Sequence, residues 1–258
     1  MKLRKVNAAT GLEWVKLGIR TFVRQPLAIS GLFFMFMAAV TLLSVIPILG
    51  TVIAVVLTPA INLGLMAASR EATMGRFPMP SLLIGSFRGN PARARAMLIL
   101  GGLYGAALLL TLGVAMVFGP DLPPPDPETG VTPEIIATIL GSPGLWLAML
   151  MYIPVSMMFW HAPALVHWHG VSPTKSLFFS LMACWTNKSA LMLYLAAWMG
   201  VIMAGAMLIS LVGGLLGGAT ALSFILYPSA LFMASMFYAS IYFTFRDSFE
   251  TAENLETD

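Results

Sequence analysis

The chain has 258 residues, of which 59% are hydrophobic and only 10% are charged, and its mean hydropathy is +0.87. Soluble domains carry roughly 25% charged residues, so this composition excludes a water-soluble globular protein. The formal net charge is only +3, and we attribute the basic residues to membrane topology rather than to nucleic-acid binding. Because Cys184 is the single cysteine, an intrachain disulfide is excluded.

An amphipathic stretch over residues 9–25 follows the basic N-terminus. Its charged residues recur every three or four positions and share one helix face: Glu13, Lys16, Arg20 and Arg24. Apolar residues occupy the opposite face, with Trp14 nearby. This pattern predicts a helix that lies on the membrane surface, and a helix packed on a partner is the alternative. We expect no cleavable signal peptide, because the first apolar run continues into a full span.

Four long runs without Asp, Glu, Lys or Arg define the membrane spans. They cover residues 26–69, 96–120, 135–174 and 189–245 and are 44, 25, 40 and 57 residues long. A bilayer core takes about 20 apolar residues per helix, so two of the runs hold two spans and the other two hold one. The six predicted spans are about 27–46, 51–69, 96–118, 143–168, 189–211 and 220–245.

Two polar stretches interrupt the spans in different ways. A short apolar helix is predicted at about 81–88, among arginines. Residues 119–134 form a loop rich in proline and acidic residues, without Lys or Arg, which cannot enter the bilayer because its backbone would be unsatisfied there. Within it, Thr132-Pro133-Glu134 predicts the start of a short helix that continues to about Leu140. The fold class predicted is an all-α membrane protein, with one polytopic domain over 1–246 and an acidic cytoplasmic tail over 247–258.

The basic residues predict the orientation of this domain. With six spans, all 14 Lys and Arg fall on one side: six before the first span, five between the second and third, then Lys175, Lys188 and Arg246. Cytoplasmic loops carry the excess of Lys and Arg, so both termini are predicted to be cytoplasmic in a bacterial inner membrane. The acidic, proline-rich loop is then periplasmic or external.

Three units of similar order follow one another, each an amphipathic segment and a hairpin of two spans. They cover residues 9–69, 76–169 and 171–245. The second helix of each hairpin carries a proline: Pro59, Pro154 and Pro228. Asn90 and Asn187 end the amphipathic segments of the second and third units, where they can cap the next span. A proline inside a span kinks the helix and frees a carbonyl, so the repeat predicts three kinks around one central region.

The residues at the bends carry a family resemblance. Ser86-Phe87-Arg88-Gly89-Asn90 and its counterpart Asn187-Lys188 each lead into a span rich in Leu and Ala. This pattern resembles a group of uncharacterised bacterial six-helix inner-membrane proteins. It is also similar to the membrane domain of some bacterial glycerophosphodiester phosphodiesterases. The resemblance covers most of residues 9–245 and implies location and shape rather than activity, because the catalytic phosphodiesterase domain is missing.

The fourth span ends with the three histidines of the chain, His161, His167 and His169. At about 100° per residue, these side chains spread around the helix and do not converge on a metal. An ionisable residue inside a span is a functional candidate, and His161 is the deepest of the three. A soft-metal site shared with Met157 is one interpretation, and a neutral imidazole bonded to a neighbouring helix is the other.

Other candidate residues are uncharged inside the spans and basic at their ends. Asn62 and Tyr152 lie near two of the prolines, where they either join helices or contact a solute. Five arginines follow the second span and are candidates to hold anionic lipid head groups: Arg70, Arg76, Arg88, Arg93 and Arg95. Topology alone also explains basic residues at these positions.

Signatures of an enzyme are missing from the sequence: no paired carboxylates, phosphate loop or metal-spaced His and Cys cluster occurs. We therefore predict a non-enzymatic protein without a cofactor that interacts with lipids, anionic ones among them, or serves as an accessory or assembly subunit. Its partners would be lipids, another membrane protein or a second copy of the chain. A transporter or channel for a small neutral or lipidic solute is the alternative, and it predicts a polar cavity near the prolines. A lipid-modifying enzyme is a third alternative.

Overall fold

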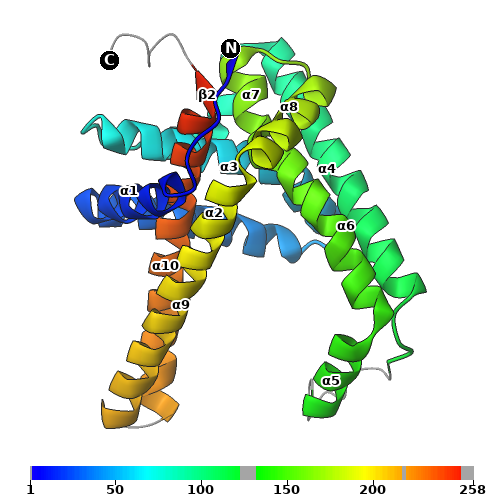
Figure 1. Cartoon of the computed structure of the whole chain (residues 1–258), viewed down its shortest axis with the longest axis vertical. Coiled ribbons are helices and arrows are strands. Elements are labelled where there is room, and N and C mark those ends of the chain that lie inside the picture. Colours follow the sequence, from blue (N-terminus) through cyan, green and yellow to red (C-terminus); the bar gives the residue numbers. More distant parts are fainter. Residues whose placement is uncertain (1, 123–131, 217–218, 251–258) are drawn as a thin grey trace.

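The computed structural model describes residues 2–122, 132–216 and 219–250 (Figure 1). Its helices are α1 (Thr10–Arg24), α2 (Pro26–Ser44), α3 (Leu49–Thr73), η1 (Pro80–Phe87), α4 (Pro91–Val117), α5 (Pro133–Gly141), α6 (Pro143–Trp160), α7 (Ala162–His169), α8 (Pro173–Thr186), α9 (Lys188–Leu216) and α10 (Ala219–Ser248). Two short strands, β1 (Lys2–Leu3) and β2 (Phe249–Glu250), pair antiparallel and join the two ends of the described chain.

In the described residues, six helical segments are long and apolar enough to cross a membrane. This confirms the prediction of an all-α, multi-pass membrane protein. The fourth segment, Pro143–His169, is broken at His161 into α6 and α7. Four other helices are longer than predicted: α9 and α10 continue to Leu216 and Ser248. In α3, which continues to Thr73, and α4, which begins at Pro91, charged residues extend the helices beyond their apolar parts.

Capping side chains set several helix starts. Asn90 accepts hydrogen bonds from the backbone N–H groups of Ala92 and Arg93, and Pro91 needs no such partner, so α4 begins there. Thr132 and Ser142 cap α5 and α6 in the same way, each followed by proline. The predicted short helix near 81–88 is present as η1, but with 3₁₀ rather than α geometry.

The predicted three units pack in a ring. The first is α1, α2 and α3, the second is η1, α4 and α6–α7, and the third is α8, α9 and α10. In each unit the leading helix packs on the hairpin of the preceding unit: η1 on α3, α8 on α6 and α7, and α1 on α9 and α10. The last of these contacts joins the first unit to the third and therefore closes the ring.

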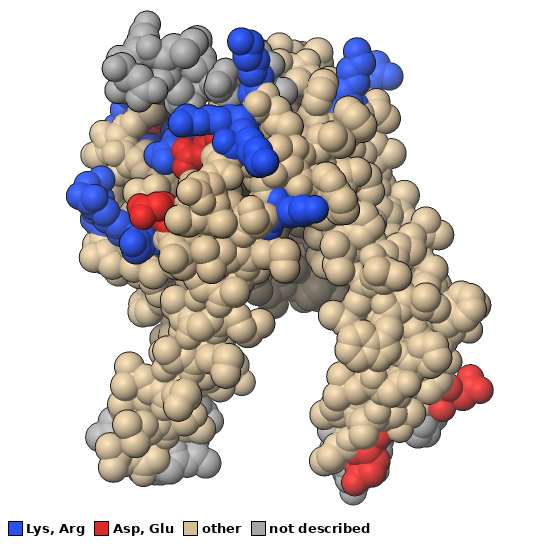
Figure 2. Space-filling view, in the orientation of Figure 1, with Lys and Arg blue, Asp and Glu red and all other residues tan. Residues whose placement is uncertain are grey.

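Two hairpins extend away from the ring as separate legs. Figure 1 shows α9–α10 as one leg and α4–α6 as the other, with α5 at its foot. The α2–α3 hairpin bridges them, because α3 packs on both α4 and α10. In Figure 2 the lysines and arginines gather at the joined end, the legs are free of them, and acidic residues lie at the foot of the α4–α6 leg. The basic segments and the acidic loop, which alternate along the chain, thus lie at opposite ends of the molecule.

The apolar face of α1 is buried on protein of the same chain. Trp14 is fully buried, and Val15 and Phe22 are nearly so, against α9 and α10. The predicted polar face is exposed, as Lys16 and Arg20 show. The structure therefore adds a contact that the sequence did not indicate, because α1 packs on α9 and α10 of its own chain.

A clasp at the bend between α8 and α9 ties the chain ends together. Asn187 is buried; its Oδ1 accepts from the backbone N–H of Val6 at 2.9 Å, and its Nδ2 donates to the carbonyl of Arg4 at 3.0 Å. The prediction that the Asn187 side chain caps the next span is therefore wrong. In the first unit, Gln25 donates to the carbonyl of Arg76 at 3.1 Å, so both bends bind the segment that leads into the next unit.

The acidic tail begins later than predicted. Asp247 and Ser248 belong to α10, and Phe249 and Glu250 form β2, so four residues assigned to the tail are part of the fold. Phe249 is almost completely buried in the core. The remaining predicted tail, 251–258, lies outside the described residues, as does the middle of the proline-rich loop, 123–131.

Candidate functional site

A cavity of about 240 Å³ lies where the three hairpins meet. We call it the hub cavity. Its walls come from α3, α4, α6 and α10, and they are formed by Thr58, Asn62, Met66, Tyr104, Tyr152, Ser156, Phe159, Trp160, Phe237, Tyr238 and Ile241. Six of these side chains carry a hydroxyl or amide group, and none carries a charge. The arrangement suits an uncharged group that forms hydrogen bonds.

Asn62 is the polar group of this cavity that the protein leaves unsatisfied. Its Oδ1 is buried and has no hydrogen-bond partner among the described residues. A buried amide oxygen without a partner costs about 1–3 kcal/mol, so such an atom is uncommon unless it serves a purpose. Tyr152, the other predicted polar candidate, lies in the same wall and is 43% exposed. The structure thus brings together the two polar residues that were singled out from the sequence.

The three prolines do not converge on one centre, which corrects the prediction of three equivalent kinks. Pro59 is buried beside the hub cavity, and Pro154 lies in the helix that contributes Tyr152 and Ser156. Pro154 and Pro228 are both exposed on their helices. Leu226 and Ala230, on either side of Pro228, line a separate groove between α9 and α10.

Two apolar grooves run along the legs. One, of about 500 Å³, lies between α3 and α4 and includes Val52, Leu109 and Leu112. The other, of about 450 Å³, lies between α9 and α10, and we call it the leg groove; it is formed by Ile202, Ala206, Ile209, Leu226, Ala230, Met233, Ala234, Phe237 and Tyr238. Phe237 and Tyr238 also line the hub cavity, so the leg groove and the hub cavity adjoin.

His161 occupies the break between α6 and α7 and is fully buried. Its Nε2 lies 3.1 Å from the Thr244 hydroxyl of α10, which also accepts from the indole of Trp160 at 3.0 Å. Thr244 donates its one proton to the carbonyl of Ile241 at 2.7 Å, so Nε2 of His161 acts as donor. The residue therefore joins two helices, as the second interpretation from the sequence predicts.

The helix breaks at His161 just before Pro163, which has no backbone N–H to donate, and Ser180 of α8 bridges the break. Its hydroxyl accepts from the backbone N–H of His161 at 2.9 Å and donates to the carbonyl of Met157 at 2.7 Å. These are the two groups that would bond each other in an unbroken helix, so the hydroxyl replaces that bond. Cys184 lies on the same helix, with its Sγ 3.8 Å from Nδ1 of His161. Burial raises the pKa of the Cys184 thiol to about 12, so it stays protonated at neutral pH.

The other two histidines are separated from this junction. His167 and His169 are partly buried in α7, and one ring nitrogen of each is buried and has no hydrogen-bond partner in the described part of the chain. No group of three His, Cys, Asp or Glu that could hold a metal is found among the described residues. Ser180 and Thr244 were not predictable as partners of His161, because a single hydroxyl in an apolar helix gives no local signal of what it contacts.

The arginines of the second unit differ in their contacts. Arg76 forms an ion pair with Glu71 at 3.5 Å, and Arg70 lies over the ring of Trp168 at 5.9 Å. Arg88, Arg93 and Arg95 are exposed and form no ion pair with the described residues. Beside them is a groove of about 510 Å³, which we call the elbow groove; it is formed by Phe87, Gly89, Asn90, Pro91, Ala94, Arg95 and Leu98.

Comparison with known proteins places this membrane fold in a family. A protein of Burkholderia thailandensis described as a probable inner membrane protein is 34% identical over 275 residues, covering 98% of this chain and 96% of the relative. The chain belongs to this family of inner membrane proteins. The name records a location and no activity. No protein-family model and no solved structure matches the chain, so similarity to the phosphodiesterase membrane domain is not shown.

Proposed function

We propose that this inner membrane protein is a non-enzymatic, lipid-interacting protein that binds anionic lipid head groups at the elbow groove. The observation that carries the proposal is a set of three exposed arginines that form no ion pair with the described residues. Arg95 lines the groove, and Arg88 and Arg93 are neighbours in the chain of its lining residues. A phosphate there would meet the guanidinium of Arg95, and guanidinium groups bind phosphate through strong, charge-assisted hydrogen bonds. Phe87 and Leu98 in the groove wall supply apolar surface for the start of an acyl chain.

The non-enzymatic part of the proposal rests on the chemistry of the polar residues in the spans. The hub cavity has no carboxylate, imidazole, thiol or ammonium group in its lining. The side chains of His161 and Cys184 form hydrogen bonds between helices. Among the exposed residues of the legs, apolar side chains such as Leu109, Met116 and Met207 dominate. These faces suit lipid, another membrane protein or a second copy of the chain, which is consistent with an accessory role.

Neutralising the elbow arginines tests the lipid proposal. We expect the triple variant Arg88→Gln, Arg93→Gln and Arg95→Gln to lose most co-purified phosphatidylglycerol or cardiolipin in native mass spectrometry. Each basic residue near a lipid surface contributes about 1 kcal/mol, so three give a change on the order of 100-fold in affinity. The matched control removes three charges from α1, with Lys16→Gln, Arg20→Gln and Arg24→Gln. Equal lipid loss in both variants, or in neither, would contradict a site at the elbow groove.

The same proposal places the joined, basic end of the molecule in the cytoplasm. Support comes from the gathering of Lys and Arg at this end and of acidic residues at the foot of the α4–α6 leg (Figure 2). A reporter fused after Lys175 is expected to show cytoplasmic activity, and one inserted after Pro120 to show periplasmic activity. A periplasmic signal at Lys175 would rule out this orientation.

A carrier or channel for a small neutral or lipidic solute is the second candidate. The observation that favours it is the polar-lined hub cavity, in which Asn62 and Tyr152 meet as that alternative predicts. Binding needs only the cavity of about 240 Å³ itself, whereas passage needs a continuous path across the membrane. Binding therefore accounts for this geometry with fewer assumptions than passage across the membrane.

A further inference from the structure

The hub cavity and the leg groove together form a space that is polar at one end and apolar along the rest. The hub cavity offers the amide of Asn62 and the hydroxyls of Tyr152 and Ser156. The leg groove offers side chains such as Ile202 and Met233, with little polar surface. Phe237 and Tyr238 belong to both, so the two spaces adjoin, and a molecule that occupied both would pass beside these two side chains. A ligand that fits must be amphipathic, with a small head and a long tail.

The charges in the lining select the head group. All hub-cavity residues are neutral, so an ionised phosphate or ammonium placed there would lose its hydration without a counter-charge, at a cost of several kcal/mol. A hydroxyl, ester or quinone carbonyl carries no such penalty. The cavity of about 240 Å³ is also below the roughly 300–1,000 Å³ of pockets for drug-sized ligands, so it takes a small head.

Asn62 gives an independent sign that a ligand belongs there. Its amide lines the hub cavity, and its Oδ1, which has almost no accessible surface, lacks a partner among the described residues. Rotation of the amide would turn Oδ1 toward a hydroxyl donor in the cavity. Tyr152 in the same lining is 43% exposed, so the cavity is accessible from outside the protein at this residue, which lies in α6 of one leg. An acyl chain already in the bilayer can enter by that route without crossing the joined end.

We infer that the hub cavity binds the uncharged, hydroxyl-bearing head of a neutral lipid such as a diacylglycerol, whose tail lies in the leg groove between α9 and α10. This inference deepens the proposed lipid interaction by naming a second lipid class, and it rests on that proposal only for the general role. The anionic lipids of the elbow groove are held by charge. The lipid of the hub cavity is held by hydrogen bonds to Asn62 and Tyr152 and by apolar contact.

Photolabelling tests the inference. The protein is reconstituted in nanodiscs of phosphatidylethanolamine and phosphatidylglycerol with a diacylglycerol that carries a diazirine in one acyl chain. We expect labels on α9 and α10 between Ile202 and Ile209 and between Leu226 and Phe237. The double variant Asn62→Leu and Tyr152→Phe should reduce this labelling about three- to tenfold, as expected for lost neutral hydrogen bonds. Tyr227→Phe is the matched control, because Tyr227 is 77% exposed and outside both spaces.

Two further readouts make the outcome decisive. Asn62→Leu alone should leave the melting temperature unchanged or higher, because it removes an unsatisfied atom, so loss of labelling cannot be ascribed to unfolding. A phosphatidylglycerol with the same diazirine chain should label the leg groove weakly. Unchanged diacylglycerol labelling in the double variant, or equal labelling by both probes, would overturn the inference. The elbow arginine variant should lose anionic lipid and keep diacylglycerol labelling, so failure of either proposal shows separately.

Discussion

Valine at Gly11 and Gly18 is expected to release α1 from the ring and to destabilise the protein by about 3 kcal/mol or more. A Cβ atom at Gly11 would lie 2.2 Å from the carbonyl oxygen of Ala190 in α9, and one at Gly18 would lie 2.3 Å from Cβ of Ser240 in α10. The helix backbones that hold these atoms cannot move aside, so α1 must move instead. The small residues therefore allow the close crossing that closes the ring.

The single cysteine provides a direct readout of this release. Cys184 is replaced by alanine and Val15, which is 5% exposed on α1, is replaced by cysteine. Maleimide labelling at Val15→Cys should be slow in the parent and fast in the double glycine variant. Gly200→Val is the matched control, because a Cβ at that position meets nothing within 4 Å. Slow labelling in all variants would show that α1 tolerates the larger side chains.

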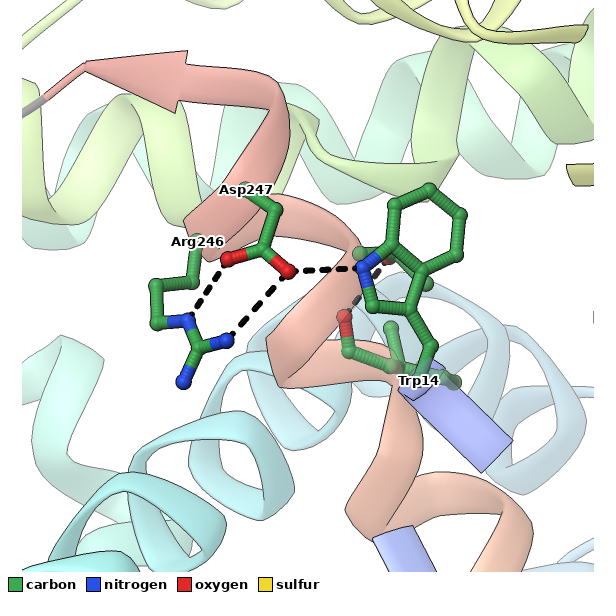
Figure 3. Close-up of polar contacts among 5 residues, drawn as sticks. Trp14, Arg246 and Asp247 are labelled. Carbon is green, nitrogen blue, oxygen red and sulfur yellow. Dashed lines mark hydrogen bonds and ion pairs between the residues drawn. The ribbon is translucent and has the colours of Figure 1, made fainter. Parts of the chain in front are cut away.

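Trp14→Ala is expected to cost about 3–5 kcal/mol, the loss typical of a fully buried aromatic side chain. The indole packs on Tyr194 with ring centroids 6.0 Å apart, and its Nε1 donates to Oδ2 of Asp247 at 2.9 Å. Figure 3 shows Asp247 between this indole and the guanidinium of Arg246, whose Nε donates to Oδ1 at 2.7 Å. The Trp14 side chain thus packs in the apolar core and also bonds the C-terminal end of α10.

Trp14→Phe separates the two contributions. Phenylalanine keeps most of the packing and removes the hydrogen bond to the carboxylate, so a smaller loss of about 1.5–3 kcal/mol is expected. The control is Trp185→Ala, since Trp185 is 59% exposed and such changes usually stay within about 0.5 kcal/mol. Thermal unfolding in one detergent measures all three variants. Equal melting temperatures for Trp14→Ala and Trp185→Ala would contradict the burial of α1 on α9 and α10.

Local features of the chain were predictable because they depend on short stretches. Charge-free runs of membrane length predicted the six spans, and Asn90, Thr132 and Ser142 begin helices as their side chains require. The break at His161 has a local signal in Pro163, which cannot donate a backbone hydrogen bond to the preceding turn, but the group that bridges the break has no such signal. That group is the Ser180 hydroxyl, 19 positions away, which replaces a backbone hydrogen bond.

The residues of the candidate site were also predictable from the sequence only in part. Asn62 and Tyr152 stood out as polar residues in apolar helices, yet no local pattern showed that they face one cavity with Tyr104 and Tyr238. The three prolines suggested a common centre that the fold does not form, because the rotation of each helix decides which face a proline occupies. The five arginines after the second span were candidates for lipid head-group binding on the basis of their charge alone. Only the structure distinguishes Arg76, which forms an ion pair with Glu71, from the exposed Arg95.

By itself the sequence determined the class of this protein, its six spans and the separation of its charges, since hydropathy and charge act residue by residue against lipid and water. The tertiary structure alone decided the ring, the clasp and the cavity. Asn187 binds Val6 across 181 positions of the chain, and Thr244 meets His161 across 83. Such contacts depend on how helices cross, which is set by small residues and side-chain shape at both surfaces together.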